Sequence, residues 1–156
     1  MKPLLVRVLL SAAMPLVLAG LTKEQSDVLN DGGGWEYLTI TDVNNGFETQ
    51  HVCFDEKGRG ECTGQLMLRK DGTFLQTVTG HGKSVDRHGT YTLDGDQLTF
   101  SDELGTKDGP YTVNVDVPSS KMEIATTQAG VTIKVKLMLE REFRKLADES
   151  NKRKPQ

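Results

Sequence analysis

The feature that most constrains the fold is the alternation of apolar and polar residues over the second half of the chain. Apolar residues occupy every second position in successive runs, and Thr, Lys, Glu, Asn and Asp residues stand between them. The side chains of a β-strand point alternately to its two faces, so a period of two indicates strands with one buried and one solvated face. The apolar members are Tyr91, Leu93, Leu98, Phe100, Tyr111, Val113, Val115, Val117, Met122, Ile124, Val131, Ile133, Val135, Leu137 and Leu139.

Turn residues separate these runs at the places where antiparallel neighbours would meet. Asp94-Gly95, the segment 102–110, the segment 118–121 and the segment 128–130 carry the Gly, Pro, Asp and Ser residues that tight turns use. The first half of the chain is less regular but similar. It predicts further strands at 35–41, 47–54, 63–69 and 73–79, because these segments are rich in β-branched and aromatic residues.

The arrangement of strands and turns predicts an all-β, up-and-down barrel of about eight or nine antiparallel strands. A parallel sheet would need helical crossovers, and helical spacing is found only before the first strand and after Phe143. Short joints between nearly all neighbours favour a barrel over a sandwich, with a loop at 80–89 as the one candidate for a long crossing. Thr22 and Gln25 have the spacing of a capping box for a short first helix.

The first twenty residues are typical of a signal peptide. Lys2 and Arg7 give a basic start, an apolar run follows, and Ala19-Gly20 offers small residues for cleavage. We therefore expect a signal peptide over 1–20 that is cleaved near Gly20, a barrel domain over 21–145 and a charged, disordered tail over 146–156. The expected location is the periplasm or the medium, without integral membrane association. Cleavage leaves 17 basic and 22 acidic residues, a net charge of −5, which does not favour nucleic acid as a partner.

The two cysteines lie on either side of a turn signal at residues 57–60. In an oxidising compartment, Cys53 and Cys62 are expected to form a disulfide bond across this hairpin. The alternative is a metal site that uses His51 with both thiolates, since His51 and Cys53 share one face of a strand. No fourth ligand is evident nearby, so the disulfide is the prediction and no metal is assigned.

The opening "GGGWEYLTI" resembles the Gly-x-Trp signature of lipocalins and the wider calycin superfamily, with Gly33 and Trp35 at the start of the first strand. "LRKDGTFLQTV" and "HGTYTLDGDQLTF" are similar to segments of bacterial lipocalin-like domains. The resemblance covers most of residues 32–143. It implies a barrel floor in which a late basic residue packs over Trp35, and Arg141 is the best match, with Arg144 the second choice.

The resemblance also implies an exported binding protein that holds a small apolar molecule inside the barrel. Tyr91 and Tyr111 are expected to orient the ligand through their hydroxyl groups. The alternative is a structural or interaction protein with a filled barrel that acts through its loops or tail. The expected cavity lining consists of Tyr91, Phe100, Tyr111, Val113, Val115, Ile124, Ile133 and Val135.

An enzyme is the third hypothesis, and it would use the loop 81–88. Ser84, Asp86 and His88 could be drawn as a catalytic set, but neither a nucleophile elbow nor an oxyanion-hole pattern accompanies them. His81 and His88 could likewise ligate a metal or a haem, although a hydrated loop is the simpler interpretation. We therefore assign neither catalytic residues nor a cofactor.

Overall fold

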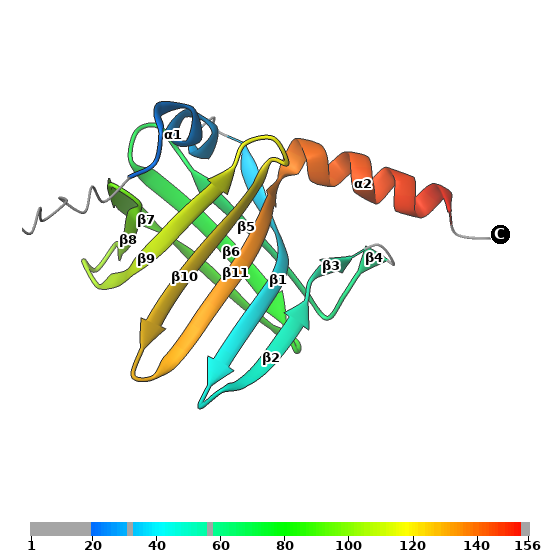
Figure 1. Ribbon diagram of the computed structural model, residues 1–156, viewed down its shortest axis with the longest axis horizontal. Coiled ribbons are helices and arrows are strands. Elements are labelled where there is room, and N and C mark those ends of the chain that lie inside the picture. Colours follow the sequence, from blue (N-terminus) through cyan, green and yellow to red (C-terminus); the bar gives the residue numbers. More distant parts are fainter. Residues whose placement is uncertain (1–19, 31–32, 56–57, 154–156) are drawn as a thin grey trace, which may run out of the picture.

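The computed structural model describes residues 20–30, 33–55 and 58–153, and the first nineteen residues, over which the signal peptide is expected, lie outside this range. Two α-helices and eleven β-strands follow each other along the described chain (Figure 1). Their bounds are α1 Lys23–Leu29, β1 Gly34–Asn44, β2 Phe47–Val52, β3 Phe54–Asp55, β4 Gly58–Arg59, β5 Cys62–Leu68, β6 Thr73–Gly80, β7 Lys83–Asp94, β8 Gln97–Asp102, β9 Lys107–Asp116, β10 Lys121–Gln128, β11 Val131–Leu139 and α2 Glu140–Lys152.

Eight antiparallel strands close into a barrel, as the alternation predicts. β5 to β11 pair in sequence order, and β1 pairs with both β5 and β11. β1 and β11 are paired from Trp35–Leu139 to Asn44–Val131, so the last strand closes on almost the whole length of the first. The pairing satisfies the backbone hydrogen bonds along this seam, where an unpaired strand edge could otherwise associate with another chain.

The ninth strand of the sheet, β2, lies beside the C-terminal half of β1. β1 pairs with β5 only over Gly34–Glu36 and with β2 over Thr39–Asn44. A register shift in the β1–β11 pairing falls between Tyr37 and Thr39, where a bulge lets a strand bend and twist. The barrel wall is therefore split on this side, with β2 along one margin of the split and β5 along the other.

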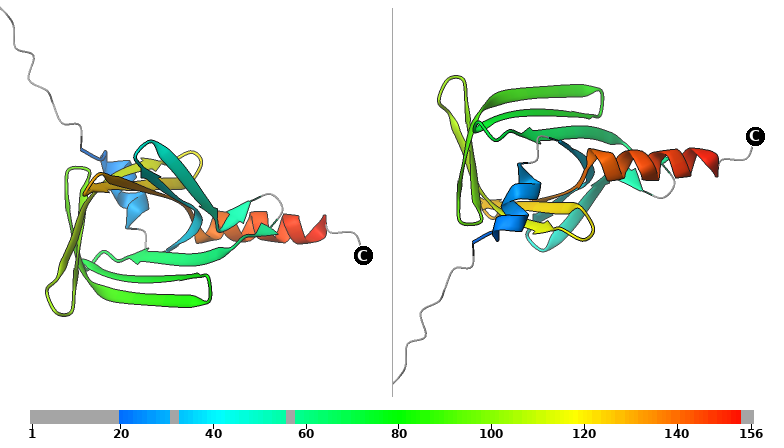
Figure 2. Two further views of the ribbon diagram at one scale, coloured as in Figure 1. Left: turned by 90° about the horizontal axis from the view of Figure 1, so that it is seen from below. Right: turned by 90° about the horizontal axis from the view of Figure 1, so that it is seen from above.

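One end of the barrel is closed by α1, which lies across it (Figure 2). The predicted capping box is confirmed: the Thr22 side chain accepts from the Gln25 backbone amide, and the Gln25 side chain accepts from the Thr22 amide. Gln25 Nε2 also donates to the Val115 carbonyl oxygen at 2.8 Å. Leu29 is fully buried in the core. We call this the closed end.

The interior of the closed half is one continuous packed cluster. Its largest fully buried side chains include Trp35, Phe74, Phe100 and Leu137. The rings of Phe74 and Phe100 lie 4.7 Å apart between centroids, in a tilted arrangement. Burial of such large apolar side chains is the main stabilising contribution to a barrel of this size.

Helix α2 follows β11 directly and projects away from the barrel wall (Figure 1). Phe143 is buried in a second cluster outside the barrel with Phe54 and Met138, and its ring centroid lies 4.5 Å from that of Phe54. The chain is helical as far as Lys152, so most of the tail that was expected to be disordered from residue 146 is helical in this structure. The regular i,i+3 and i,i+4 ion pairs Lys145–Glu142 and Arg144–Glu140 support the helix.

The long loop expected over 80–89 is wrong. β6 and β7 form a continuous hairpin, and a two-residue turn of His81 and Gly82 joins them. The first half of β7 has no apolar alternation, because its outer face and part of its inner face are polar, so the sequence pattern did not predict it.

A membrane-spanning helix is not found in the part of the chain that the structure describes, since neither α1 nor α2 has the length and apolar composition to cross a bilayer.

Candidate functional site

The barrel interior changes character from the closed end to the opposite end, which we call the open end. Cross-strand pairs on the inner face of β6 and β7 run from Phe74–Gly89 through Gln76–Arg87 to Val78–Val85. Pairs directly opposite each other in an antiparallel ladder share a face, so all of these residues belong to the interior row. The row is therefore packed and aromatic at one end, polar in the middle and apolar again at the open rim.

The apolar residues of the open rim are much less buried than those of the closed half. Ile133 shares the inner face of β11 with Val135 and Leu137, yet 38% of its surface is exposed, and Val85 is 53% exposed. Residues two apart on one strand face the same way, so these side chains belong to the inner face, and their exposure shows that solvent reaches this face at the open rim. The barrel is thus filled at its closed end and open at the other.

A polar network crosses the middle of the barrel. Arg87 Nη1 donates to Asp108 Oδ2 at 2.7 Å and lies 3.3 Å from Gln76 Oε1. Gln76 Nε2 donates to the Tyr37 hydroxyl oxygen at 2.7 Å, and the Tyr111 hydroxyl donates to Asp108 Oδ1 at 2.8 Å. The network therefore joins β1, β6, β7 and β9, and each of these polar groups has a hydrogen-bond partner within it.

Burial within this network changes the acidity of its tyrosines. Desolvation raises the pKa of Tyr37, and desolvation together with the hydrogen bond to Asp108 raises the pKa of Tyr111 strongly. The Tyr37 ring lies against Gly64, where an added Cβ would be 2.8 Å from the ring, so only glycine leaves room for it. At the closed end, burial also raises the pKa of Tyr91.

All three tyrosines of the chain are therefore expected to resist ionisation in the folded protein. A raised pKa in the native state means that the unfolded chain releases its tyrosine protons first, so this stabilising contribution is complete below about pH 10 and is lost as the pH rises further. Tyrosinate absorbance should stay low in the native protein up to about pH 10.5, and urea unfolding should give a smaller free energy at that pH than at pH 8. A native tyrosine that titrates at its ordinary pKa would contradict the expectation. Protein in denaturant provides the control.

Beyond the polar network, the split in the barrel wall holds a hollow of about 220 Å³. Ile40, Val78 and Val85 form its apolar lining. Four further residues lie at its margin: His51, Glu61, His81 and Lys83. The hollow is large enough to enclose a small organic group or one end of a longer molecule, whose remainder would lie along the open rim.

Most of the residues that were expected to line a cavity lie in the packed core and not at the hollow. Phe100, Val113, Val115, Ile124 and Val135 are buried in the packed cluster, and Tyr91 and Tyr111 pack against it. Of the eight, Ile133 alone is substantially exposed at the open rim. The Tyr91 hydroxyl lies 2.7 Å from Asn30 Oδ1 and 2.8 Å from the Arg69 carbonyl oxygen, which share its one proton as acceptors, and the Tyr111 hydroxyl donates to Asp108. Contact of these residues with a ligand stays a prediction.

Trp35 is fully buried in the closed end, and its Nε1 donates to the Leu29 carbonyl oxygen at 3.3 Å. Arg141 and Arg144 begin α2 near this end and line a surface hollow together with Gly33. Packing of either guanidinium over the Trp35 ring stays a prediction.

The disulfide bond between Cys53 and Cys62 is confirmed.

Ser84, Asp86 and His88 occupy alternate positions on the outer face of β7, opposite to the interior row. The Thr79 hydroxyl donates to Ser84 Oγ at 3.1 Å, and His88 Nε2 lies 2.7 Å from Glu103 Oε1. Each of these two residues therefore has a partner on a neighbouring element, and the three form no mutual catalytic set.

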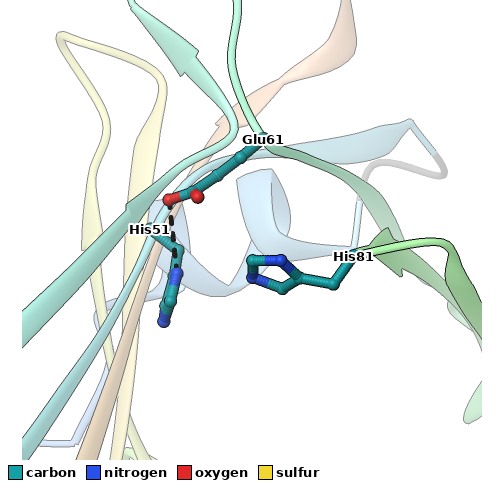
Figure 3. Close-up of side chains that lie close together, drawn as sticks. All are labelled: His51, Glu61 and His81. Atoms are coloured by element: carbon teal, nitrogen blue, oxygen red, sulfur yellow. Dashed lines mark hydrogen bonds and ion pairs between the residues drawn. The ribbon is translucent and has the colours of Figure 1, made fainter.

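Antiparallel pairing brings together a group that the sequence analysis did not connect. His51 on β2, Glu61 just before β5 and His81 in the β6–β7 turn each place a ligand atom within 4.8 Å of the others (Figure 3). His51 Nδ1 lies 3.2 Å from Glu61 Oε1, and the rings of His51 and His81 meet edge to face at 5.7 Å. One feature of the sequence could have indicated this group: His81 stands at the first position of a two-residue turn, where Asn is the usual residue.

Models of known protein families match no part of this chain, and no curated protein matches it. The closed eight-stranded antiparallel barrel is consistent with a calycin-like fold.

Proposed function

We propose that the protein is a small-molecule binding protein whose site is the open half of the barrel. The observation that carries the proposal is the set of exposed apolar side chains on the inner face of the open rim, where Val85 lines a hollow of about 220 Å³ and Ile133 is also exposed. Apolar side chains that face an unfilled interior lower the free energy of binding when an apolar group covers them. The ligand is a small molecule with an apolar body and few polar atoms, and no enzymatic step is needed.

The polar network sets what the ligand could present at the inner end of the hollow. Gln76 and Arg87 stand one interior row below Val78 and Val85, and Arg87 is only partly buried. A hydrogen-bond acceptor on the ligand could share the guanidinium, which has five N–H groups and uses few of them in the contacts with Asp108 and Gln76. A sugar or a nucleotide would have to place polar atoms against Ile40, Val78 and Val85, whose side chains offer no hydrogen-bonding groups.

Titration with the fluorescent apolar probe ANS, followed by competition with a fatty acid or a retinoid, tests the proposal. We expect saturable binding near one site, which Val85→Trp should weaken about tenfold or more because the indole fills the hollow. Leu75→Trp is the matched control, since Leu75 is an exposed apolar residue on the neighbouring strand and faces outward. Equal binding by both variants, or no binding by the folded wild-type protein, would overturn the proposal.

A second candidate function is docking of a protein partner on the outer wall. A hollow of about 430 Å³ lies between α2 and the barrel, lined in part by Leu38, Phe54, Met138 and Leu146. This observation favours the interaction hypothesis, in which the barrel is a filled scaffold. Failure of the probe experiment in a folded protein would make it the preferred function.

We further propose that the protein works outside the cytoplasm after removal of residues 1–20. The Cys53–Cys62 disulfide supports this location, because disulfides persist in oxidising compartments. Peptide mapping of the native protein should find a first residue near Gly20 or Leu21.

A further inference from the structure

His51, Glu61 and His81 converge from three separate segments at the edge of the hollow, and Figure 3 shows the His81 ring directed toward the other two side chains. His51 stands opposite Ile40 in the β1–β2 ladder and so shares the interior face of the rim. Two imidazoles and one carboxylate are a donor set that Zn²⁺ and related divalent ions accept.

The backbone holds each of these three residues in place. Glu61 N–H donates to the Val52 carbonyl oxygen at 2.9 Å, and the next residue, Cys62, is tied by the disulfide to Cys53. At Gly60 an added Cβ would lie 1.9 Å from the Val52 oxygen, so only glycine allows the chain to pass this close to β2. Glu61 is thereby kept beside His51.

His81 is positioned by a turn that restricts its backbone. His81 has φ +50° and Gly82 φ +74°, the two positive values of a type I′ hairpin turn. The corresponding β1–β2 turn has Asn45 and Gly46 at φ +50° and +79°, which is the favoured pair. A histidine is tolerated at the first position, but Asn would stabilise the turn at least as well. The turn conformation therefore does not explain why a histidine stands at position 81.

The spacing leaves a metal ion within reach. Donor atoms around a tetrahedral Zn²⁺ lie about 3.3 Å apart, and partly exposed side chains could close from 4.8 Å by small rotations. Asp42 Oδ2 stands 3.8 Å from His51 Nε2, the ring nitrogen away from Glu61, and a small approach to hydrogen-bond distance would make it the outer carboxylate that orients a ligating histidine. Lys83 lines the same hollow and is the one positively charged group among its lining residues.

We propose that His51, Glu61 and His81 bind a divalent transition-metal ion of the Zn²⁺ class, with a fourth coordination position open toward the hollow. This goes beyond the binding function proposed above, because the ion needs no apolar molecule. A ligand in the hollow that carries a donor atom could complete the coordination.

Calorimetric titration of the untagged, disulfide-bonded protein with Zn²⁺ tests the site, and Co²⁺ absorption reports the coordination geometry. We expect one ion per chain and an affinity loss of at least about tenfold in His81→Asn and in Glu61→Gln. His81→Asn is informative because Asn is the favoured residue of this turn, so the variant should fold at least as well as wild type. The third histidine of the chain supplies the matched control: His88→Asn should leave affinity unchanged.

Absence of binding by the wild-type protein would overturn the proposal, as would binding that survives in both His81→Asn and Glu61→Gln. The ANS titration is independent of these outcomes, since it is performed without metal. Loss of the metal site with retention of the probe site would therefore leave the proposed binding function in place.

Discussion

Replacing Trp35 by Ala is expected to lower the free energy of unfolding by about 3 to 5 kcal/mol. The ring is fully buried at the closed end, and its Nε1 holds the Leu29 carbonyl oxygen at the end of α1. The substitution removes the contacts of the ring, leaves a void that a closed barrel cannot easily collapse and removes one of the hydrogen bonds that hold α1 against the barrel. A loss of this size is a large fraction of the stability of an ordinary domain.

Urea unfolding monitored by circular dichroism measures this loss in both proteins. Tryptophan fluorescence cannot be used for the comparison, because Trp35 is the only tryptophan of the chain and the variant has no indole. Leu104→Ala is the control, since Leu104 is 92% exposed and its truncation should change stability by no more than about 0.5 kcal/mol. Trp35→Phe retains most of the ring and should lose less than the alanine variant. A loss below about 1 kcal/mol in Trp35→Ala would show that the closed end does not depend on this side chain.

Removing the disulfide by the double substitution Cys53→Ser and Cys62→Ser is expected to cost about 2 to 3 kcal/mol. The bond closes a short loop, with a sequence separation of 9, and its main contribution is to restrict the unfolded chain. Both sulfur atoms belong to buried residues, so the serine hydroxyls also enter a setting that previously held apolar atoms.

Urea unfolding with and without a reducing agent separates the two causes. The oxidised wild-type protein should be the most stable form, the reduced wild type should lose most of the expected 2 to 3 kcal/mol, and the double variant should not respond to the reductant. Titration of the denatured, non-reduced protein should find no free thiol. Two titratable thiols in freshly purified protein would contradict the predicted bond in solution.

Local sequence determined the strands and most of their joints. The alternation from Tyr91 to Leu139 was sufficient for β8 to β11 and for the last residues of β7, because a period of two is a property of the single strand and needs no partner. Thr22 with Gln25 and Asn45 with Gly46 specify a helix start and a turn for the same reason, since their hydrogen bonds and backbone angles are satisfied within a few residues. The pairing of Cys53 with Cys62 across a short return of the chain was equally local.

The candidate site depended on contacts that no local pattern contains. Val113 and Ile133 both belong to the apolar alternation of the sequence, yet Val113 is buried in the packed cluster and Ile133 is exposed at the open rim. The difference arises because strand register and barrel closure set the position of each residue along the barrel axis. Arg87 reads as a loop charge in the sequence and is an interior residue in the structure, opposite Gln76. His51 and His81 meet only because β1 leaves β5 for β2 and the wall splits beside the β6–β7 turn. The sequence alone therefore determined which residues form most of the strands, and the closure of the barrel decided which of them are packed in the core and which line the hollow.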